Sequence, residues 1–242
     1  MTERILFFAY ALLSVANVAA EAVGASAFAG ITKACLMPLL LAWLVVTLRR
    51  SRPGHPAARW LGVGLVFAWF GDLLLNGDGA SVFKAGIVAF LVMQLCYIAS
   101  FTRIPGPGLV RSRKLLALPY LALWALLNGS LRGRVGALGP AVLVYSAVLI
   151  GMALAALDLF GRVDRRMGWR IAVGAPIFVV SDSMIALTAF GPLPPSHAMD
   201  AAIMATYVVA QGLIVTGMAG ALGVATASSS APTSPAGMER GG

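Results

Sequence analysis

Charged residues are scarce in this chain of 242 residues, since they make up only 11% of it, against about 25% in typical globular domains. Cysteine and histidine occur only twice each. Two cysteines are too few for a disulfide-rich secreted scaffold. A catalytic zinc ion needs about three protein ligands, and His55 and His197 have no partners at helical spacing. We therefore expect no metal site and no cofactor.

Several catalytic and binding motifs are missing as well. No Gly-x-Ser-x-Gly sequence is present, and the two histidines fall in loops expected on opposite sides, so a serine triad is excluded. No glycine-rich phosphate loop precedes a lysine, which excludes ATP-driven chemistry. The net charge is +9, but the basic residues are spread over short loops without a recognition motif. We therefore expect no nucleic-acid binding.

Hydrophobic residues, by contrast, make up 60% of the chain, and the mean hydropathy is +0.88. Such a composition is typical of a polytopic membrane protein, because a helix that crosses the bilayer needs about 20 mostly apolar residues. The fold class we expect is an all-α bundle of about eight transmembrane helices with a buried polar cavity. The expected spans are residues 5–24, 28–48, 60–76, 83–101, 115–128, 137–160, 171–190 and 198–224.

The basic residues predict the orientation of these helices, since short cytoplasmic loops collect Lys and Arg. The loops at 49–59, 103–114 and 162–170 carry four basic residues each, including Arg49, Arg50, Arg52 and Arg59 in the first of them. The opposite loops hold only Arg132, Arg134 and Lys84. We therefore expect a multi-pass protein of the cell membrane with both termini in the cytoplasm, Arg4 and Arg240 included.

The chain divides into a membrane domain and a tail. Residues 1–224 form the expected eight-helix domain, and residues 225–242 are rich in Ala, Ser, Thr, Pro and Gly. Such a segment cannot bury a core, so we expect a disordered C-terminal tail. Cys35 and Cys96 fall within expected helices, which favours free thiols over a disulfide.

Two aspartates are the best indication of function. Asp72 lies in the run Phe70 to Leu75, and Asp182 lies in the apolar run 178–187. A carboxylate at bilayer depth costs roughly 2.5 to 3.5 kcal/mol on insertion scales, so it normally faces the bundle interior and has a function. The alternative is a hydrogen bond that only packs two helices, although Ser, Thr, Asn and Gln make such contacts more often.

Other polar residues accompany the two aspartates inside the expected helices. Several share one face with a neighbour at i, i+4 spacing, which favours a polar cavity with apolar walls. Ordinary hydrogen bonds between helices remain an equal alternative for Asn17, Gln94 and Gln211, and Lys33 either reaches the membrane surface or pairs with a carboxylate. These residues are Asn17, Glu21, Lys33, Asn76, Gln94, Tyr97, Tyr207 and Gln211.

Two carboxyl groups in one dry cavity suit acid and base catalysis. Burial favours the neutral form of one group, while a nearby ammonium favours the ionised form of the other. This pair could hydrolyse a bond through an oxocarbenium-like transition state, which needs a proton donor, a negative group and a positioned water molecule. An aspartyl pair that cleaves peptide bonds, or one that relays protons in a transporter, would need the same groups.

The order and spacing of several motifs resemble the YhhN family over most of residues 28–218. One departure is Ala34 where the family commonly has a proline after Lys33, and another is Gln94 where a histidine is expected. The motifs that carry the resemblance are Ile31-Thr32-Lys33 with Met37-Pro38, Phe70-Gly71-Asp72-Leu73, Cys96-Tyr97-Ile98, Tyr145, Ser181-Asp182-Ser183, Tyr207 and Ala210-Gln211.

Characterised members of that family are lysoplasmalogenases, integral-membrane hydrolases of the vinyl-ether bond. The resemblance implies a lysophospholipid substrate with one alkenyl chain on glycerophosphocholine or glycerophosphoethanolamine. Asp72 and Asp182 would be the catalytic residues, with the roles of acid and base left open. Lys33 or Lys84 would bind the phosphate. The full set of expected substrate-binding residues is Glu21, Lys33, Asn76, Tyr97, Tyr145, Ser181, Tyr207 and Gln211.

The competing hypothesis is a proton-coupled transporter of a lipid or small molecule that uses the same aspartates. Against it, the sequence shows no inverted repeat and no matching pair of broken helices. An aspartyl intramembrane protease is a third hypothesis, but its Tyr-Asp and Gly-x-Gly-Asp motifs are absent. The oligomeric state is left open by the sequence.

Overall fold

The computed structural model describes residues 1–51 and 55–229, and every regular element in that part is a helix. Eight of these helices are long and apolar enough to cross a membrane, which confirms the expected all-α bundle. The α-helices are α1 (Thr2–Ala22), α2 (Ser26–Ser51), α3 (Pro56–Leu75), α4 (Ala80–Thr102), α5 (Leu109–Ser112), α6 (Leu118–Leu131), α7 (Gly139–Asp158), α8 (Arg165–Ala189) and α9 (His197–Ser229).

The boundaries differ from the expected ones by a few residues at most ends. The fifth span is longer than residues 115–128, because α6 continues to Leu131 and the 3-10 turn before it begins at Lys114, which gives a candidate span Lys114–Leu131. The short helix α5 was not expected. At the other end of the chain, α9 continues to Ser229, and residues 230–242 of the expected tail lie outside the described residues.

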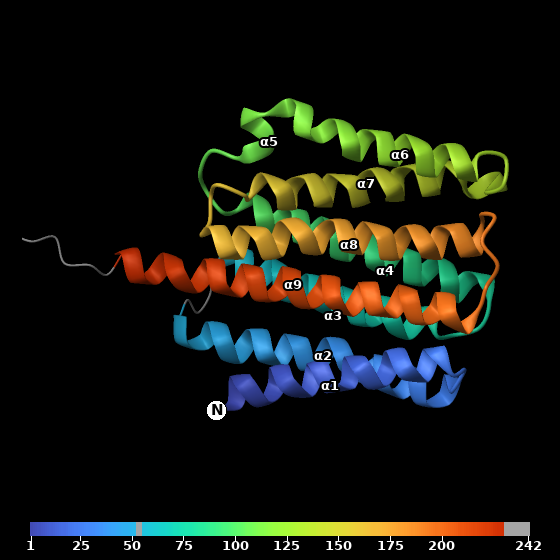
Figure 1. The fold of residues 1–242 in the computed structure, drawn as a ribbon, viewed down its shortest axis with the longest axis horizontal. Helices are drawn as coiled ribbons and strands as arrows, with labels where there is room; N and C mark the ends of the chain where they lie inside the picture. Colours follow the sequence, from blue (N-terminus) through green and yellow to red (C-terminus); the bar gives the residue numbers. More distant parts are fainter. Residues whose placement is uncertain (52–54, 230–242) are drawn as a thin grey trace, which may run out of the picture.

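The long helices run alternately in opposite directions, so the first residue and the end of α9 lie at the same end of the bundle (Figure 1). The end of α2, the start of α3 and the loops after α4 and α7 lie at that end as well. The basic residues expected in the cytoplasm therefore share one end with the first residue and the end of α9, apart from Arg52 and Arg240, which fall outside the described residues.

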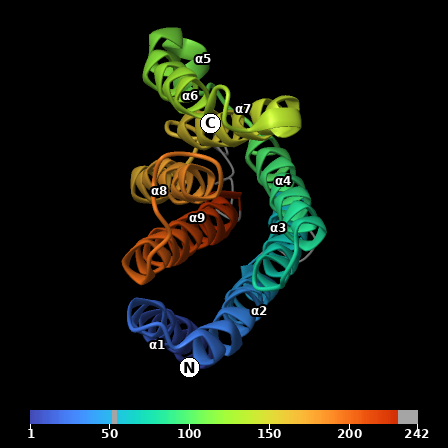
Figure 2. The same ribbon diagram turned by 90° about the vertical axis from the view of Figure 1, so that its right-hand side faces the viewer.

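Viewed roughly along the helices, α1 to α4 form a curved row, and α8 and α9 lie on its concave side (Figure 2). Small residues allow the neighbouring helices to approach closely. A Cβ atom on Gly64 of α3 would lie 2.6 Å from the ring of Tyr97, and one on Gly71 would lie 2.7 Å from the ring of Phe90. These two glycines allow Tyr97 and Phe90 of α4 to pack closely against α3, and Gly71 directly precedes Asp72.

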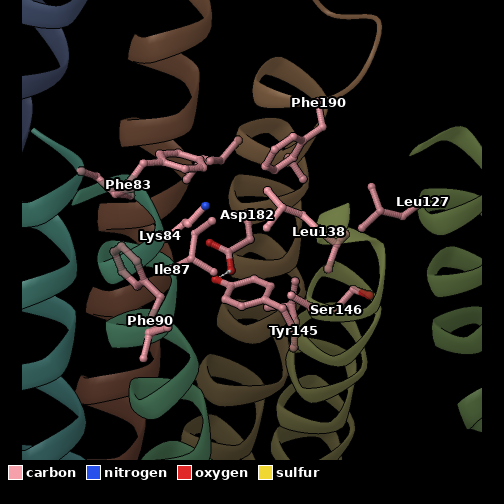
Figure 3. Close-up of a pocket in the computed structure, with 17 residues that line it drawn as sticks. Phe83, Lys84, Ile87, Phe90, Leu127, Leu138, Tyr145, Ser146, Asp182 and Phe190 are labelled. Carbon is pink, nitrogen blue, oxygen red and sulfur yellow. Dashed lines mark hydrogen bonds between the residues drawn. The ribbon is translucent and has the colours of Figure 1, made fainter. Parts of the chain in front are cut away.

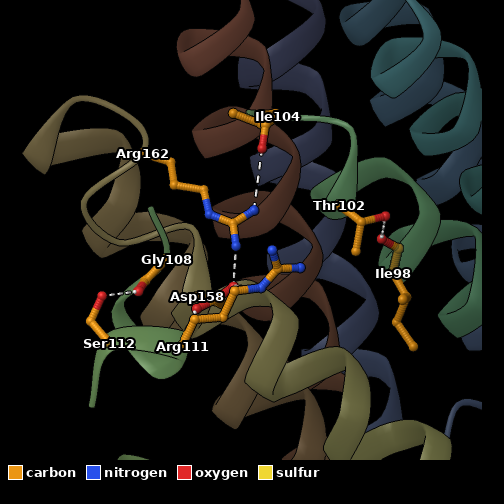
Figure 4. Close-up of polar contacts among 8 residues, drawn as sticks. All are labelled: Ile98, Thr102, Ile104, Gly108, Arg111, Ser112, Asp158 and Arg162. Carbon is orange, nitrogen blue, oxygen red and sulfur yellow. Dashed lines mark hydrogen bonds and ion pairs between the residues drawn. The ribbon is translucent and has the colours of Figure 1, made fainter. Parts of the chain in front are cut away.

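A buried carboxylate fixes the loop that connects α4 to α5 (Figure 4). Asp158, at the end of α7, accepts a hydrogen bond from the backbone N–H of Arg111 at 3.0 Å. It also pairs with Arg162, whose guanidinium donates to the carbonyl of Ile104 at 3.2 Å. The cluster ties α7 to the segment that leads to α5 and α6, and these two helices lie at the edge of the bundle.

Candidate functional site

Asp182 is held on α8 by donors from two other helices. The Tyr145 hydroxyl of α7 donates to Asp182 Oδ2 at 2.6 Å, and Gln94 Nε2 of α4 donates to the same oxygen at 3.1 Å. Asp182 is only 7% exposed. Both bonds end on Oδ2, and no residue in the described structure donates to Oδ1. One oxygen of this carboxyl group is thus left for chemistry.

The carboxyl group of Asp182 faces a pocket of about 250 Å³ between α4, α6, α7 and α8 (Figure 3). Apart from Asp182, Tyr145, Ser146 and Lys84, the lining side chains are apolar. The labelled apolar residues of this wall are Phe83, Ile87, Phe90, Leu127, Leu138 and Phe190. This is a concave, mostly apolar site with a few convergent polar groups, as small-molecule sites usually are.

Asp72 belongs to a second hydrogen-bonded group. It is 2% exposed and accepts a hydrogen bond from the Tyr207 hydroxyl of α9 at 2.8 Å. Nearby, the Tyr97 hydroxyl donates to Gln211 Oε1 at 2.6 Å. Lys33 of α2 makes no direct salt bridge with Asp72 within the described structure, but it is close enough for a favourable charge–charge interaction. Asp72 thus has Lys33 as a cationic neighbour without a direct salt bridge.

An aromatic contact connects the two groups. The ring of Phe90, which lines the pocket, packs edge-on against Tyr207 with 6.0 Å between the ring centroids. Phe178 packs against the same tyrosine at 5.9 Å. Asp182 lines the pocket, whereas Asp72 does not, and Phe90 and Tyr207 connect Asp72 to the pocket wall. The two carboxyl groups also have separate hydrogen-bond partners.

Three of the expected substrate-binding residues lie apart from these groups. Asn76, at the end of α3, is exposed and lies beside Gly30 of α2. Glu21 is half-buried near the end of α1. The Ser181 hydroxyl donates to the carbonyl of Ile203 at 2.9 Å, a contact between α8 and α9. None of the three lines the pocket.

Gln94 was left open by the sequence between a packing role and a role in the site. In the structure its Nε2 donates to Asp182, while its Oε1 is buried and has no hydrogen-bond partner in the described part of the chain. A buried acceptor without a partner carries a desolvation cost of about 1 to 3 kcal/mol. The signal in the sequence was an uncharged polar residue in the middle of an apolar helix, which does not reveal its partner.

Asn17, for which the sequence left the same alternative, packs two helices. Its Nδ2 donates to the carbonyl of Ala29 at 2.8 Å and to Thr32 Oγ1 at 2.9 Å, so it joins α1 to α2. Cys35 and Cys96 are both free thiols, as expected. Within the described ranges, no group of three or more His, Cys, Asp or Glu could hold a metal ion.

A second and more open groove lies between α1, α2 and α9, with a volume of about 1470 Å³. Its walls include Tyr10, whose hydroxyl donates to the carbonyl of Val208 at 2.7 Å. Neither aspartate lines this groove. The pocket beside Asp182 is therefore the better candidate for catalysis.

Comparisons with known proteins show which family the chain resembles. The model of the YhhN family matches residues 28–218. Lysoplasmalogenase TMEM86A of Homo sapiens is 36% identical over 167 residues, and the protein of the same name from Bos taurus is 37% identical. Each match covers 66% of this chain and 65% of the relative, so about a third of each relative lies outside the match. No solved structure matches the chain.

Proposed function

The chain belongs to the YhhN family, and we propose that it is a membrane-embedded hydrolase that cleaves the vinyl-ether bond of lysoplasmalogens. The products would be a fatty aldehyde and glycerophosphocholine or glycerophosphoethanolamine. Two relatives that are named lysoplasmalogenases support the proposal. The match covers 65% of their length, so the proposal for this chain also depends on its own residues.

The observation that carries the proposal is the position of Asp182. Its carboxyl group is buried in a mostly apolar pocket, is hydrogen-bonded through Oδ2 alone, and makes no salt bridge among the described residues, although Lys84 also lines the pocket. Burial without an ion pair favours the neutral acid, which can donate a proton. Hydrolysis of an enol ether starts with the transfer of a proton to carbon, so a protonated acid inside an apolar pocket suits this reaction.

The reaction can be written with balanced atoms. Asp182 donates its proton to the β-carbon of the vinyl ether, and the double bond becomes an oxocarbenium ion. The Tyr145 and Gln94 hydrogen bonds then stabilise the carboxylate that is left behind. Water adds to the oxocarbenium carbon and gives its proton back to Asp182. The hemiacetal that forms transfers its hydroxyl proton to the glycerol oxygen as the bond from carbon to that oxygen breaks, which releases the aldehyde and the glycerophosphodiester.

Gln94 supplies a site for the water molecule in this proposal. Its Oε1 is a buried acceptor without a partner in the described structure, and its Nε2 is bonded to Asp182. A water molecule that donates one hydrogen bond to Gln94 Oε1 would lie beside the Asp182 carboxylate, which must accept the other proton of that water. One amide would thus orient both the acid and the nucleophile.

Asp72 has a different part in the proposal. Lys33 favours the ionised form of Asp72, whereas burial opposes it. In the proposed reaction Asp72 is ionised and provides a negative charge behind Phe90 and Tyr207. Two opposite unit charges about 8 Å apart interact by about 2 kcal/mol at an effective dielectric constant of about 20. Such an interaction with the oxocarbenium ion would increase the rate roughly 30-fold. Asp182 is then the acid, and Asp72 stabilises the cation.

The test is release of aldehyde from a 1-alkenyl lysophospholipid by the purified protein in detergent. The saturated 1-alkyl analogue, which has no double bond to protonate, is the matched control substrate. Asp182→Asn should reduce kcat by a factor of about 10² to 10⁴, the usual contribution of a general acid. Asp72→Asn, which keeps an oxygen for the Tyr207 bond but loses the charge, should reduce it by about 30-fold.

Two outcomes would count against the proposal. No aldehyde from a folded parent protein would favour the transporter, which a proton-flux assay in liposomes would then examine. Full activity of a folded Asp182→Asn variant would remove the acid from the mechanism. Circular dichroism and the elution volume in detergent show whether each variant is folded.

A further inference from the structure

Three residues at one end of the pocket are not used by the proposed reaction. Lys84, in the first turns of α4, lines the pocket and carries the one positive charge among its lining residues. Phe83 lies next to it in the chain, and Phe190 caps the end of α8. The two aromatic rings meet edge to face, with 6.1 Å between their centroids. Both rings also line the pocket.

These residues lie where a lipid headgroup would be. The start of α4 and the end of α8 are at the end of the bundle opposite the first residue and the end of α9 (Figure 1), which is a membrane surface if the long helices span the bilayer. Lys84 is exposed, and Figure 3 shows its ammonium group directed towards the pocket that contains Asp182. A molecule that occupies the pocket would therefore pass from water, beside Lys84, to the apolar interior.

The chemistry of the three side chains matches a zwitterionic headgroup. An ammonium group binds phosphate as a point charge, and Lys84 makes no salt bridge to an acid among the described ion pairs. Aromatic rings bind quaternary ammonium groups through cation–π interactions. A phosphocholine group carries one phosphate and one quaternary ammonium a few bonds apart, so it can use both features at once.

We propose that Lys84 with the Phe83–Phe190 pair is the headgroup subsite of this pocket, and that it binds the phosphate and the ammonium of a phosphocholine lysolipid. The proposal rests on the proposed function, because it names the part of the substrate that is held while the ether bond meets Asp182. It also predicts a preference for phosphocholine over phosphoethanolamine. The primary ammonium of ethanolamine is more strongly hydrated than a quaternary one and gains less from the rings.

The subsite is tested by binding, which does not require turnover. The probe is 1-O-hexadecyl-glycero-3-phosphocholine, a saturated ether that the proposed reaction cannot cleave. Its dissociation constant is measured by intrinsic tryptophan fluorescence of the purified full-length protein in detergent. The comparison probes are the corresponding phosphoethanolamine and the uncharged 1-O-hexadecylglycerol, which has the same chain without a headgroup.

Lys84→Gln should weaken binding of both phosphate probes roughly tenfold or more and leave the uncharged probe unchanged. Phe190→Leu should weaken the phosphocholine probe about two- to fivefold, with a smaller effect on phosphoethanolamine. Lys114→Gln is the matched control, because Lys114 begins the 3-10 turn before α6, and α6 starts at the opposite end of the bundle (Figure 1). Unchanged binding of the uncharged probe shows that each variant keeps an intact pocket.

The results separate this inference from the proposed function. If Lys84→Gln binds the phosphocholine probe as tightly as the parent, the subsite is wrong, even if the protein releases aldehyde. If the parent binds the probe and Lys84→Gln weakens it, the subsite stands, even if no aldehyde is released. Equal weakening by Lys84→Gln and Lys114→Gln would overturn the subsite as well, since it would indicate a general effect of net charge.

Discussion

The bond from Tyr145 to Asp182 gives a prediction whose size follows from the structure. Replacing Tyr145 by Phe removes the hydroxyl that donates to Asp182 Oδ2 at 2.6 Å and keeps the ring that lines the pocket. In the ground state this bond is made to a neutral acid, and in the transition state to a carboxylate that is forming. The variant therefore loses an interaction that strengthens as the proton leaves.

The magnitude is the difference between two kinds of hydrogen bond. A neutral hydrogen bond contributes about 0.5 to 1.5 kcal/mol, and one to a charged group about 1.5 to 3 kcal/mol. The difference is about 1.4 kcal/mol, which corresponds to about a tenfold lower kcat. KM should change little, since the hydroxyl binds the acid and not the substrate.

The assay follows aldehyde release over a range of substrate concentrations, so that kcat and KM are obtained separately. Tyr120→Phe is the matched control, because Tyr120 lies on the peripheral helix α6 and does not line the pocket. An unchanged kcat in a folded Tyr145→Phe protein would refute the reasoning. So would an equal loss in Tyr120→Phe.

Two further predictions concern stability. Gly64→Val should lower the free energy of unfolding by about 1 to 3 kcal/mol through overpacking, because the valine side chain would enter the ring of Tyr97. Gly129→Val is the control, since a Cβ atom there would have no neighbouring atom from another part of the chain within 4 Å. Equal melting temperatures of the two variants would contradict the account. Asp158→Asn should lower the free energy of unfolding by about 3 to 5 kcal/mol, because the buried guanidinium of Arg162, whose side chain is 4% exposed, then lacks its charged partner. A thermal-shift assay in detergent measures this loss. An unchanged melting temperature would show that the pair is dispensable.

The helices could be predicted from the sequence because membrane spans require long apolar runs. The alternation of basic loops supported the fifth span even though the apolar run at 115–128 was short. The short helix α5 was not predicted, since its position depends on Asp158, which lies more than 40 residues away in the chain. Such a contact between distant segments leaves no periodic pattern in the sequence.

The candidate site could be predicted only in part. Asp72 and Asp182 stood out because a buried charge is costly, but nothing in the sequence showed that their hydrogen-bond partners would be separate. Tyr207 and Tyr145 were expected near the site, and the structure adds which aspartate each one contacts. Helical spacing shows which residues share a face of one helix and does not show which face of another helix they meet.

Spacing also explains the residues that lie apart from the site. Asn76 shares a helix face with Asp72 at i, i+4, yet it lies at the end of α3 and is exposed. Ser181 adjoins Asp182 in the chain, so it points to a different side of α8 and contacts α9. In each case the position along or around the helix decided the environment, and residue type alone could not.

The most direct test of the central claim is hydrolysis in deuterium oxide, followed by mass spectrometry of the trapped aldehyde. If Asp182 transfers a proton to the vinyl carbon, the aldehyde released by the parent carries one deuterium at carbon 2, and Asp182→Asn releases almost none. Aldehyde without deuterium at that carbon, or labelled aldehyde released at the parent rate by folded Asp182→Asn, would contradict the account.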